Sequence, residues 1–166
     1  MEAALSVLNE MEAAGLVQGA AIGGALAAFF YSEAVVTEGL DVFVLMASRR
    51  GLVDLTPVYE FLKARGATEH REHLLLAGIL LQIIPAFDPL TEEAVRDACR
   101  RVIGNTPTRV MTAEHLVAIA LKTGRAKDRS RIALLLEEAD IDRPRLKDIL
   151  GRHGLLDAWN RFMGST

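Results

Sequence analysis

The amino-acid sequence predicts an α+β fold, in which helices flank a small mixed β-sheet and a helical extension follows. Up to residue 111, short apolar runs bounded by glycine or proline alternate with segments of helical spacing. Beyond that point the helical pattern continues to the end of the sequence, and no linker separates the two parts. We therefore expect one continuous domain, with an α/β core over residues 1–111 and a helical extension packed on it over residues 112–166.

Four elements are expected in the first 46 residues. Apolar residues recur at helical spacing in the first, whereas the second is a short apolar run that ends at Gly23-Gly24. The segment after these glycines has few β-branched residues and favours a helix, and the segment after Gly39 favours a strand. The expected elements are a helix over residues 2–14, a buried strand over 16–22, a helix over 25–31 and a strand over 40–46.

Capping and turn residues mark the remaining elements. Thr56 before Pro57 is typical of a helix start. Two apolar runs around Ala77-Gly78 predict a hairpin, and Thr91 before two glutamates opens another helix. The expected elements are a helix over residues 57–65, a hairpin over 71–84, a helix from 91 to about 101, a strand over 108–111, and helices from 112 onward with breaks at 124, 142–144 and 151–154.

Composition and charge exclude several classes of protein. Half of the residues are apolar and a quarter are charged, which is typical of a globular chain. The net charge of −3 argues against broad, nonspecific nucleic-acid binding but leaves room for a local basic site. The sequence has a single cysteine, no signal-peptide character at its start, and an apolar run over residues 20–31 that is too short to cross a bilayer. These features predict a cytoplasmic protein with no membrane attachment.

The first candidate site combines Gly23-Gly24 with Asp41. A strand that delivers two glycines to a helix start exposes backbone N–H groups where a phosphate can sit; the alternative is a tight turn packed under the helix. Side chains at positions i and i+2 of a strand point to the same face, so carboxylates at 39 and 41 would hold one or two Mg²⁺ ions. Because residue 39 is glycine, only one of the two carboxylates is present.

A longer segment around these residues carries a family resemblance. The sequence I-G-G-A-L-A-A-F-F-Y-S-E-A-V-V-T-E-G-L-D-V-F-V resembles the signature of the polymerase-β-like nucleotidyltransferase superfamily, and Thr37 is similar to a threonine of its bacterial abortive-infection (toxin-type) branch. The resemblance implies a sheet of the nucleotidyltransferase type and Mg²⁺-dependent transfer of a nucleotidyl group from a nucleoside triphosphate to an RNA or protein acceptor. It also implies that Gly23, Gly24 and Thr37 bind the nucleotide and that Asp41 is the catalytic residue and metal ligand.

Two positions depart from the family pattern. Gly39 replaces the first acid, and Gln82 in the run G-I-L-L-Q-I-I-P replaces the third. A neutral amide oxygen is a poorer ligand than a carboxylate for a hard cation, so a weak metal site is expected. Glu38 would point to the opposite face of the strand, and Glu33 lies near the preceding helix end.

This depleted site leaves two functions that involve a nucleotide, and a structural protein that uses the fold only as a scaffold is a third alternative. One is a nucleotidyltransferase with a weak Mg²⁺ site. The alternative is a pseudoenzyme, a catalytically inactive nucleotide-binding or regulatory module that is related to toxin–antitoxin pairs and acts with a partner protein or as a homo-oligomer.

A second candidate region is the basic run K-T-G-R-A-K-D-R-S-R over residues 122–131. Cations at a helix start are disfavoured by the helix dipole, and a bound anion would relieve this conflict. The alternative is a solvated face on which Asp128 pairs with nearby cations. The overlapping sequence L-V-A-I-A-L-K-T-G-R-A-K-D, residues 116–128, resembles a segment of the same superfamily. This resemblance implies nucleotide binding by Lys122, Arg125, Lys127 and Asp128.

The segment T-E-H-R-E-H over residues 68–73 holds two histidines and two glutamates. A metal site there is disfavoured because His70 and His73 would face opposite ways on one strand. We expect a charged strand start instead.

Overall fold

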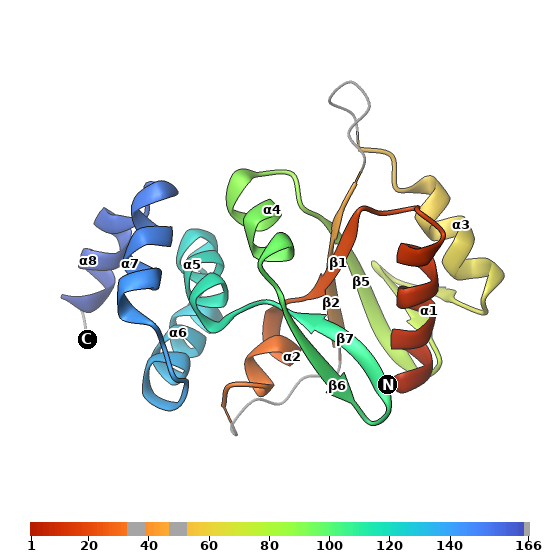
Figure 1. Cartoon of the computed structure of the whole chain (residues 1–166), viewed down its shortest axis with the longest axis horizontal. Coiled ribbons are helices and arrows are strands. Elements are labelled where there is room, and N and C mark those ends of the chain that lie inside the picture. Colours follow the sequence, from red (N-terminus) through yellow and green to blue (C-terminus); the bar gives the residue numbers. More distant parts are fainter. Residues whose placement is uncertain (33–38, 47–52, 165–166) are drawn as a thin grey trace.

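The computed structural model describes residues 1–32, 39–46 and 53–164 (Figure 1). Its elements along the chain are α1 (Glu2–Ala13), β1 (Gly19–Ile22), α2 (Gly24–Phe29), β2 (Gly39–Leu45), α3 (Thr56–Ala64), β3 (Thr68–His70), β4 (His73–Leu76), β5 (Ile79–Pro85), α4 (Pro89–Arg96), β6 (Cys99–Ile103), β7 (Thr106–Val110), α5 (Ala113–Thr123), α6 (Ala126–Glu138), α7 (Arg143–Arg152) and α8 (Leu156–Met163).

The described strands form one mixed sheet in the order β3-β4-β5-β2-β1-β7-β6. β2 pairs with β5 in parallel and with β1 in antiparallel orientation, and β1 pairs with β7 in parallel. The predicted α+β class with a mixed sheet flanked by helices is therefore confirmed. The parallel pairing of β2 with β5 matters most for function, because it brings the strand that carries Asp41 beside the strand that carries Gln82.

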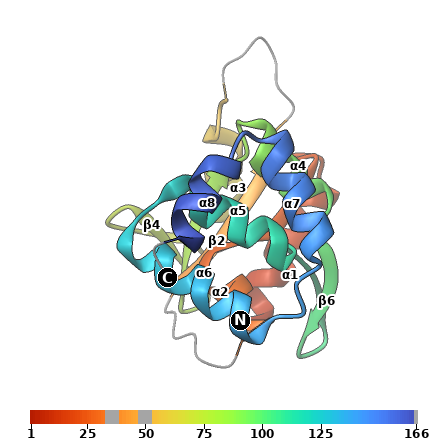
Figure 2. The ribbon, with the colours of Figure 1, turned by 90° about the vertical axis from the view of Figure 1, so that its left-hand side faces the viewer.

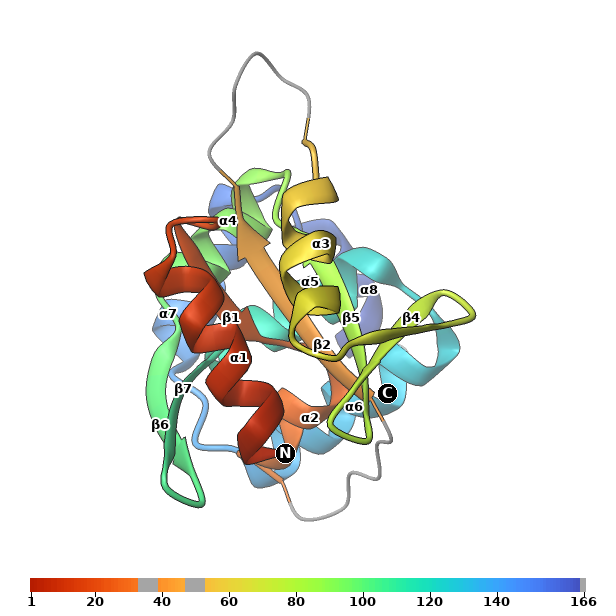
Figure 3. The same cartoon turned by 90° about the vertical axis from the view of Figure 1, so that its right-hand side faces the viewer.

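Helices cover both faces of the sheet. Figure 3 shows α1 and α3 in front of the sheet, with α5, α6 and α8 behind it. Figure 2, seen from the opposite side, has α5, α7 and α8 in front. Large apolar side chains fill the space between the layers, among them the fully buried Leu5, Met11, Leu40, Leu81 and Met111.

The hairpin predicted over residues 71–84 is confirmed as β4 and β5, with Ala77 and Gly78 both at positive φ in the turn. A strand that was not predicted, β3, precedes it. The two residues Arg71 and Glu72 join β3 to β4, and His70 pairs directly with His73 across the ladder. The expectation that these histidines face opposite ways is therefore wrong, because they lie on two antiparallel strands and not on one.

The helix predicted from residue 91 to about 101 differs from α4 at both ends. The prediction begins after the observed first residue, Pro89, and extends past the observed last residue, Arg96. α4 starts at Pro89, where the Asp88 carboxylate accepts hydrogen bonds from the backbone N–H groups of Leu90 and Thr91. It ends at Arg96, and the chain continues as β6, which pairs with β7 through a turn at Gly104.

The helical pattern predicted from residue 112 onward is confirmed as α5 to α8. The expected break at Gly124 is a left-handed residue that ends α5, and Asp142 caps the start of α7. The division between a core and an extension at residues 111 and 112 stays a prediction. No helix in the described part of the chain is long and apolar enough to cross a membrane.

Candidate functional site

Asp41 lies in a pocket of about 350 Å³ between the sheet and the helices α5 and α6, which we name the Asp41 pocket. The turn between β1 and α2 contacts it closely. Gly23 donates its backbone N–H to the carbonyl oxygen of Asp41 at 2.9 Å, and Gly24 adopts a positive φ of 59°. A Cβ at Gly24 would overlap the Asp41 carboxylate. The chain therefore needs glycine here both for its backbone conformation and for the space beside the carboxylate.

Gln82 lies next to Asp41 in the sheet. The parallel register pairs Asp41 with Gln82 and Gly39 with Leu80, so the side chains of the first pair share one face. Gly39 also lines the pocket, and in the described part of the chain the nearest atom to a Cβ there would be the Leu80 carbonyl oxygen at 3.6 Å. The three positions at which the resemblance implies acids are thus occupied by a glycine, an aspartate and an amide.

His73 joins this row from the next strand, which the sequence interpretation missed. The antiparallel register of β4 with β5 pairs Leu74 with Leu81, and one step further along the ladder it brings His73 opposite Gln82. His73 lines the Asp41 pocket accordingly. The alternation of residues in the predicted hairpin carried this information, but placing His73 required the register of β4 with β5 across the turn at Ala77-Gly78.

The α6 segment supplies the cationic side of the pocket, where Arg125, Lys127 and Arg131 line it together with Asp128. The Asp128 side chain is 1% exposed and holds two of these cations. Its Oδ2 accepts a hydrogen bond from Arg125 Nε at 2.8 Å, and its Oδ1 accepts one from Arg131 Nη1 at 3.2 Å. The alternative in which Asp128 pairs with nearby cations is therefore partly correct, but the Asp128 carboxylate is buried, and of its two partners only Arg125 is exposed.

The protonation of Asp41 reflects both burial and the nearby cations. Burial raises the pKa of Asp41 above its usual range, and electrostatic interactions with the Arg131, Lys127, His73 and Arg125 side chains oppose this increase. None of the described cations forms an ion pair with the Asp41 carboxylate, so they face it across the pocket.

No protein-family model and no curated protein sequence matches the chain. Among solved structures, it is similar to an antigenic nucleotidyltransferase-like protein from Paracoccidioides brasiliensis, with a TM-score of 0.54 and 14% identity over 95% of this chain and 90% of that one. It is also similar to the antibiotic-resistance factor ANT(2'')-Ia, with a TM-score of 0.53 and 16% identity over 97% and 99% of the two chains. The chain has a nucleotidyltransferase fold. At these identities the likeness concerns the fold alone, and the abortive-infection branch stays a prediction.

The acids of the Asp41 pocket do not fit the two-ion magnesium centre that the resemblance to the superfamily implies. Among the described residues that line the pocket, only Asp41 and Asp128 carry carboxylates, and both oxygens of Asp128 bind arginine groups. Two Mg²⁺ ions held close together need more negative charge than one free carboxylate provides. The site fits at most one weakly held ion that arrives with the phosphates of a ligand.

Three predicted nucleotide-binding residues are not part of the described pocket. The backbone N–H of Gly23 binds the Asp41 carbonyl oxygen, and Gly23 does not line the pocket. Lys122 does not line it, and its Nζ lies 3.0 Å from Asp88 Oδ1 at the start of α4. Thr37 lies outside the described residues, as do Glu33 and Glu38. A larger pocket of about 490 Å³ lies on the opposite face of the sheet, where Val42 points, and it contains none of the predicted site residues.

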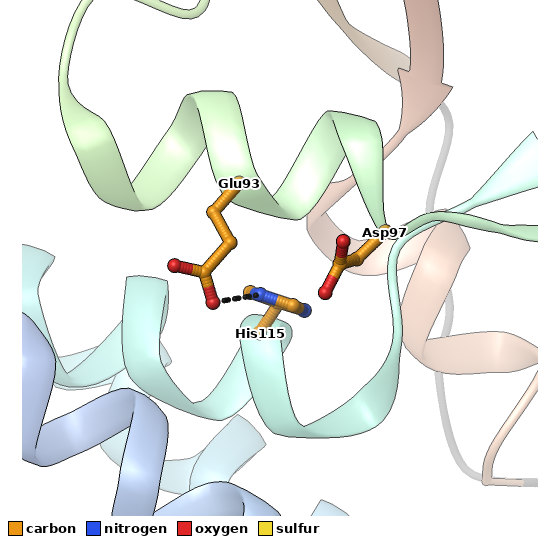
Figure 4. A group of neighbouring side chains, drawn as sticks. All are labelled: Glu93, Asp97 and His115. Carbon is orange, nitrogen blue, oxygen red and sulfur yellow. Dashed lines mark hydrogen bonds and ion pairs between the residues drawn. The ribbon is translucent and has the colours of Figure 1, made fainter.

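A second cluster of potential metal ligands joins α4 to α5. Figure 4 shows Glu93 and Asp97 on either side of His115, and their ligand atoms all lie within 4.8 Å of one another. His115 is fully buried, with its Nε2 3.3 Å from Glu93 Oε1 and its Nδ1 2.9 Å from Thr112 Oγ1. No local sequence pattern indicates this cluster, because it depends on how α4 packs against α5.

Cations already occupy both acids of this cluster. Arg152 Nη2 lies 2.5 Å from Glu93 Oε1, His153 Nε2 lies 2.8 Å from Glu93 Oε2, and Asp97 pairs with Arg145. Although partial burial alone would raise it, hydrogen bonds from Arg152, His153 and His115 lower the pKa of Glu93 to about 2. The cluster is therefore an ion-pair clamp that holds α5 and α7 against α4, and we assign it no metal.

The clamp predicts a specific loss of stability in acid. Because the folded protein lowers the pKa of Glu93 from 4.5 to about 2, its contribution is present above pH 4.5 and disappears as the pH falls through this window. The shift corresponds to roughly 3 kcal/mol at neutral pH. Urea unfolding measured between pH 2 and 7 should therefore show a shallower acid dependence in Glu93→Gln than in the unchanged protein.

Glu92→Gln is the matched control, because Glu92 lies on the same helix in an exposed pair with Arg96. Burial lowers the pKa of His115 below its usual 6.5, so its contribution decreases from that pH downward in both variants. Only the pH dependence below pH 4.5 reports on Glu93. If the free energy of unfolding has the same slope against pH there in both variants, the clamp is contradicted.

Proposed function

We propose that this chain binds a nucleoside triphosphate in the Asp41 pocket. The observation that carries the proposal is the convergence of three separate segments on one cavity: the Gly24 turn, the strand that carries Asp41, and the cationic start of α6. Three cations from the α6 segment line the pocket against two carboxylates, which leaves one positive charge in surplus. Arginine and lysine groups recognise phosphate oxygens through charge-assisted hydrogen bonds, so a triphosphate suits this surplus.

The rest of the pocket suits a nucleoside. Apolar side chains from the sheet and α5 form one part of its wall, namely Phe43, Ile84, Met111, Leu116 and Ile119. Ligand pockets commonly combine such an apolar wall with a few polar groups that fix orientation. The base and sugar would contact this wall, while the phosphates reach the Gly24 turn and the α6 cations.

Transfer of a nucleotidyl group to an RNA or protein acceptor is the second candidate function. It is favoured by Asp41, which keeps its carboxylate in the pocket beside the Gly24 turn. Asp41 would hold a single Mg²⁺ together with the phosphates, and the ion would supply charge neutralisation there. Because the two-ion centre does not fit, we rank nucleotidyl transfer second to nucleotide binding as a proposed function. A chain that only binds nucleotide would act as a regulatory module, with a protein partner or a second copy, in a pair of the toxin–antitoxin type.

Calorimetry with ATP, GTP, CTP and UTP in the presence of Mg²⁺ tests the proposal. We expect one of them to bind, and the double change Arg125→Ala with Lys127→Ala to weaken this binding at least tenfold, because it removes two charge-assisted contacts. Incubation with each labelled nucleotide and total RNA or cell protein then separates the two functions. A labelled product that disappears in Asp41→Asn supports transfer, binding without product supports the regulatory module, and no binding contradicts both.

A further inference from the structure

We propose that the Asp41 pocket holds an oligophosphate directly through Lys127, Arg131 and Arg125, with no divalent ion between the protein and the phosphates. This inference rests on the proposed function, because the ligand is the triphosphate of the same pocket. In this proposal the cations of the α6 segment contact the phosphates at the positions where metal ions would otherwise lie.

The first argument is the charge that surrounds Asp41. Its carboxylate is the only described pocket acid whose oxygens are not bound to arginine, and the Lys127 and Arg131 charges face it across the pocket. A divalent ion beside Asp41 would be repelled by these cations, whereas a phosphate group would be attracted by them. The same cations that make the site poor for a metal ion make it suitable for an anion.

The second argument is that the cations are held in place before any ligand arrives. Asp128 is almost completely buried, and its carboxylate binds Arg125 through both oxygens and Arg131 through Oδ1, so both guanidinium groups are held at the pocket wall. A guanidinium group carries five N–H donors, and each of these two keeps donors for phosphate oxygens after binding Asp128. Lys127 lines the pocket, and no described acid forms an ion pair with it, so within the described residues no carboxylate competes with a ligand for its ammonium group.

The effect of Asp41 on phosphate affinity distinguishes binding without a metal ion from binding through one. If phosphates bind without a metal ion, the Asp41 carboxylate repels them, and the isosteric change Asp41→Asn should tighten binding. If binding depends on a metal ion at Asp41, the same change should weaken it. The two routes therefore predict opposite effects on affinity from one substitution. The substitution keeps the contact with the Gly23 N–H, because that contact uses only the backbone carbonyl of Asp41.

The experiment is calorimetric titration of the full chain with ATP and with inorganic tripolyphosphate, in EDTA and in Mg²⁺. We expect similar affinity in both buffers, a loss on the order of tenfold in Lys127→Ala, and a gain of several-fold in Asp41→Asn in EDTA. Lys147→Ala is the matched control, since Lys147 is an exposed lysine of α7 that does not line the pocket.

Each outcome decides the inference. Binding in EDTA that Lys127→Ala weakens and Asp41→Asn strengthens supports it. Binding that requires Mg²⁺ and is weakened by Asp41→Asn overturns it while leaving nucleotide binding as the function. Absence of binding in both buffers overturns the inference together with the proposed function, so the two failures are distinguishable.

Discussion

Replacing Asp128 with alanine is expected to lower the free energy of unfolding by about 3 kcal/mol, the lower end of the range for breaking a buried ion pair. The Asp128 side chain is 1% exposed and binds Arg125 and Arg131, and the change would leave both cations without this partner. Arg131 carries most of the cost because its side chain is only 18% exposed, whereas Arg125 is 58% exposed and can turn toward solvent. Urea unfolding at neutral pH measures the loss.

Two further variants show that the loss comes from the buried charge pair. Asp128→Asn keeps the size and one acceptor oxygen but not the charge, so its loss should lie between the unchanged protein and Asp128→Ala. Asp148→Ala removes an acid that pairs with Arg152 at an exposed position of α7, and its cost should stay below about 1 kcal/mol. A cost for Asp128→Ala as small as that of Asp148→Ala would mean that Asp128 does not hold the α6 cations.

The central part of the site could be predicted from the sequence because it depends on neighbouring segments and on one strand pairing. The turn at Gly23-Gly24 and the strand that carries Asp41 follow each other closely in the chain, and the resemblance indicated that they meet. The placement of Gln82 depended on a parallel pairing of two separate strands, which the register of β2 with β5 confirms.

Other features depended on register and burial that no local pattern contains. His73 enters the pocket because the antiparallel register of β4 with β5 places it beside Gln82, and a shift of one residue would have pointed it to the other face. The segment after Arg96 continues as a strand because β7 is present to pair with it, whereas the local pattern also allowed a helix. Burial of Asp128 likewise follows from how α6 packs, and an acid within a basic run gives no sign of it.

Restoring both lost acids with Gly39→Asp and Gln82→Asp is expected to raise the affinity for Mg²⁺ by at least tenfold. Gly39 and Asp41 lie on the same face of β2, and Gln82 is the direct neighbour of Asp41, so three carboxylates would meet at one point of the pocket. The space at Gly39 permits a side chain, because among the described residues its Cβ would meet only the Leu80 carbonyl oxygen at 3.6 Å. Calorimetry with Mg²⁺ alone measures the gain.

The double variant Gly39→Asn with Gln82→Asn is the control, since it adds similar volume without charge. It should leave Mg²⁺ affinity unchanged, and equal affinities for the two double variants would contradict the placement of residues 39 and 82 as the missing ligand positions. The acidic variant should also lose metal-free binding of tripolyphosphate, because two added carboxylates turn a surplus of one positive charge into a surplus of one negative charge. A gain in Mg²⁺ affinity and a loss of tripolyphosphate binding in the same variant would both follow from the changed charge of the Asp41 pocket.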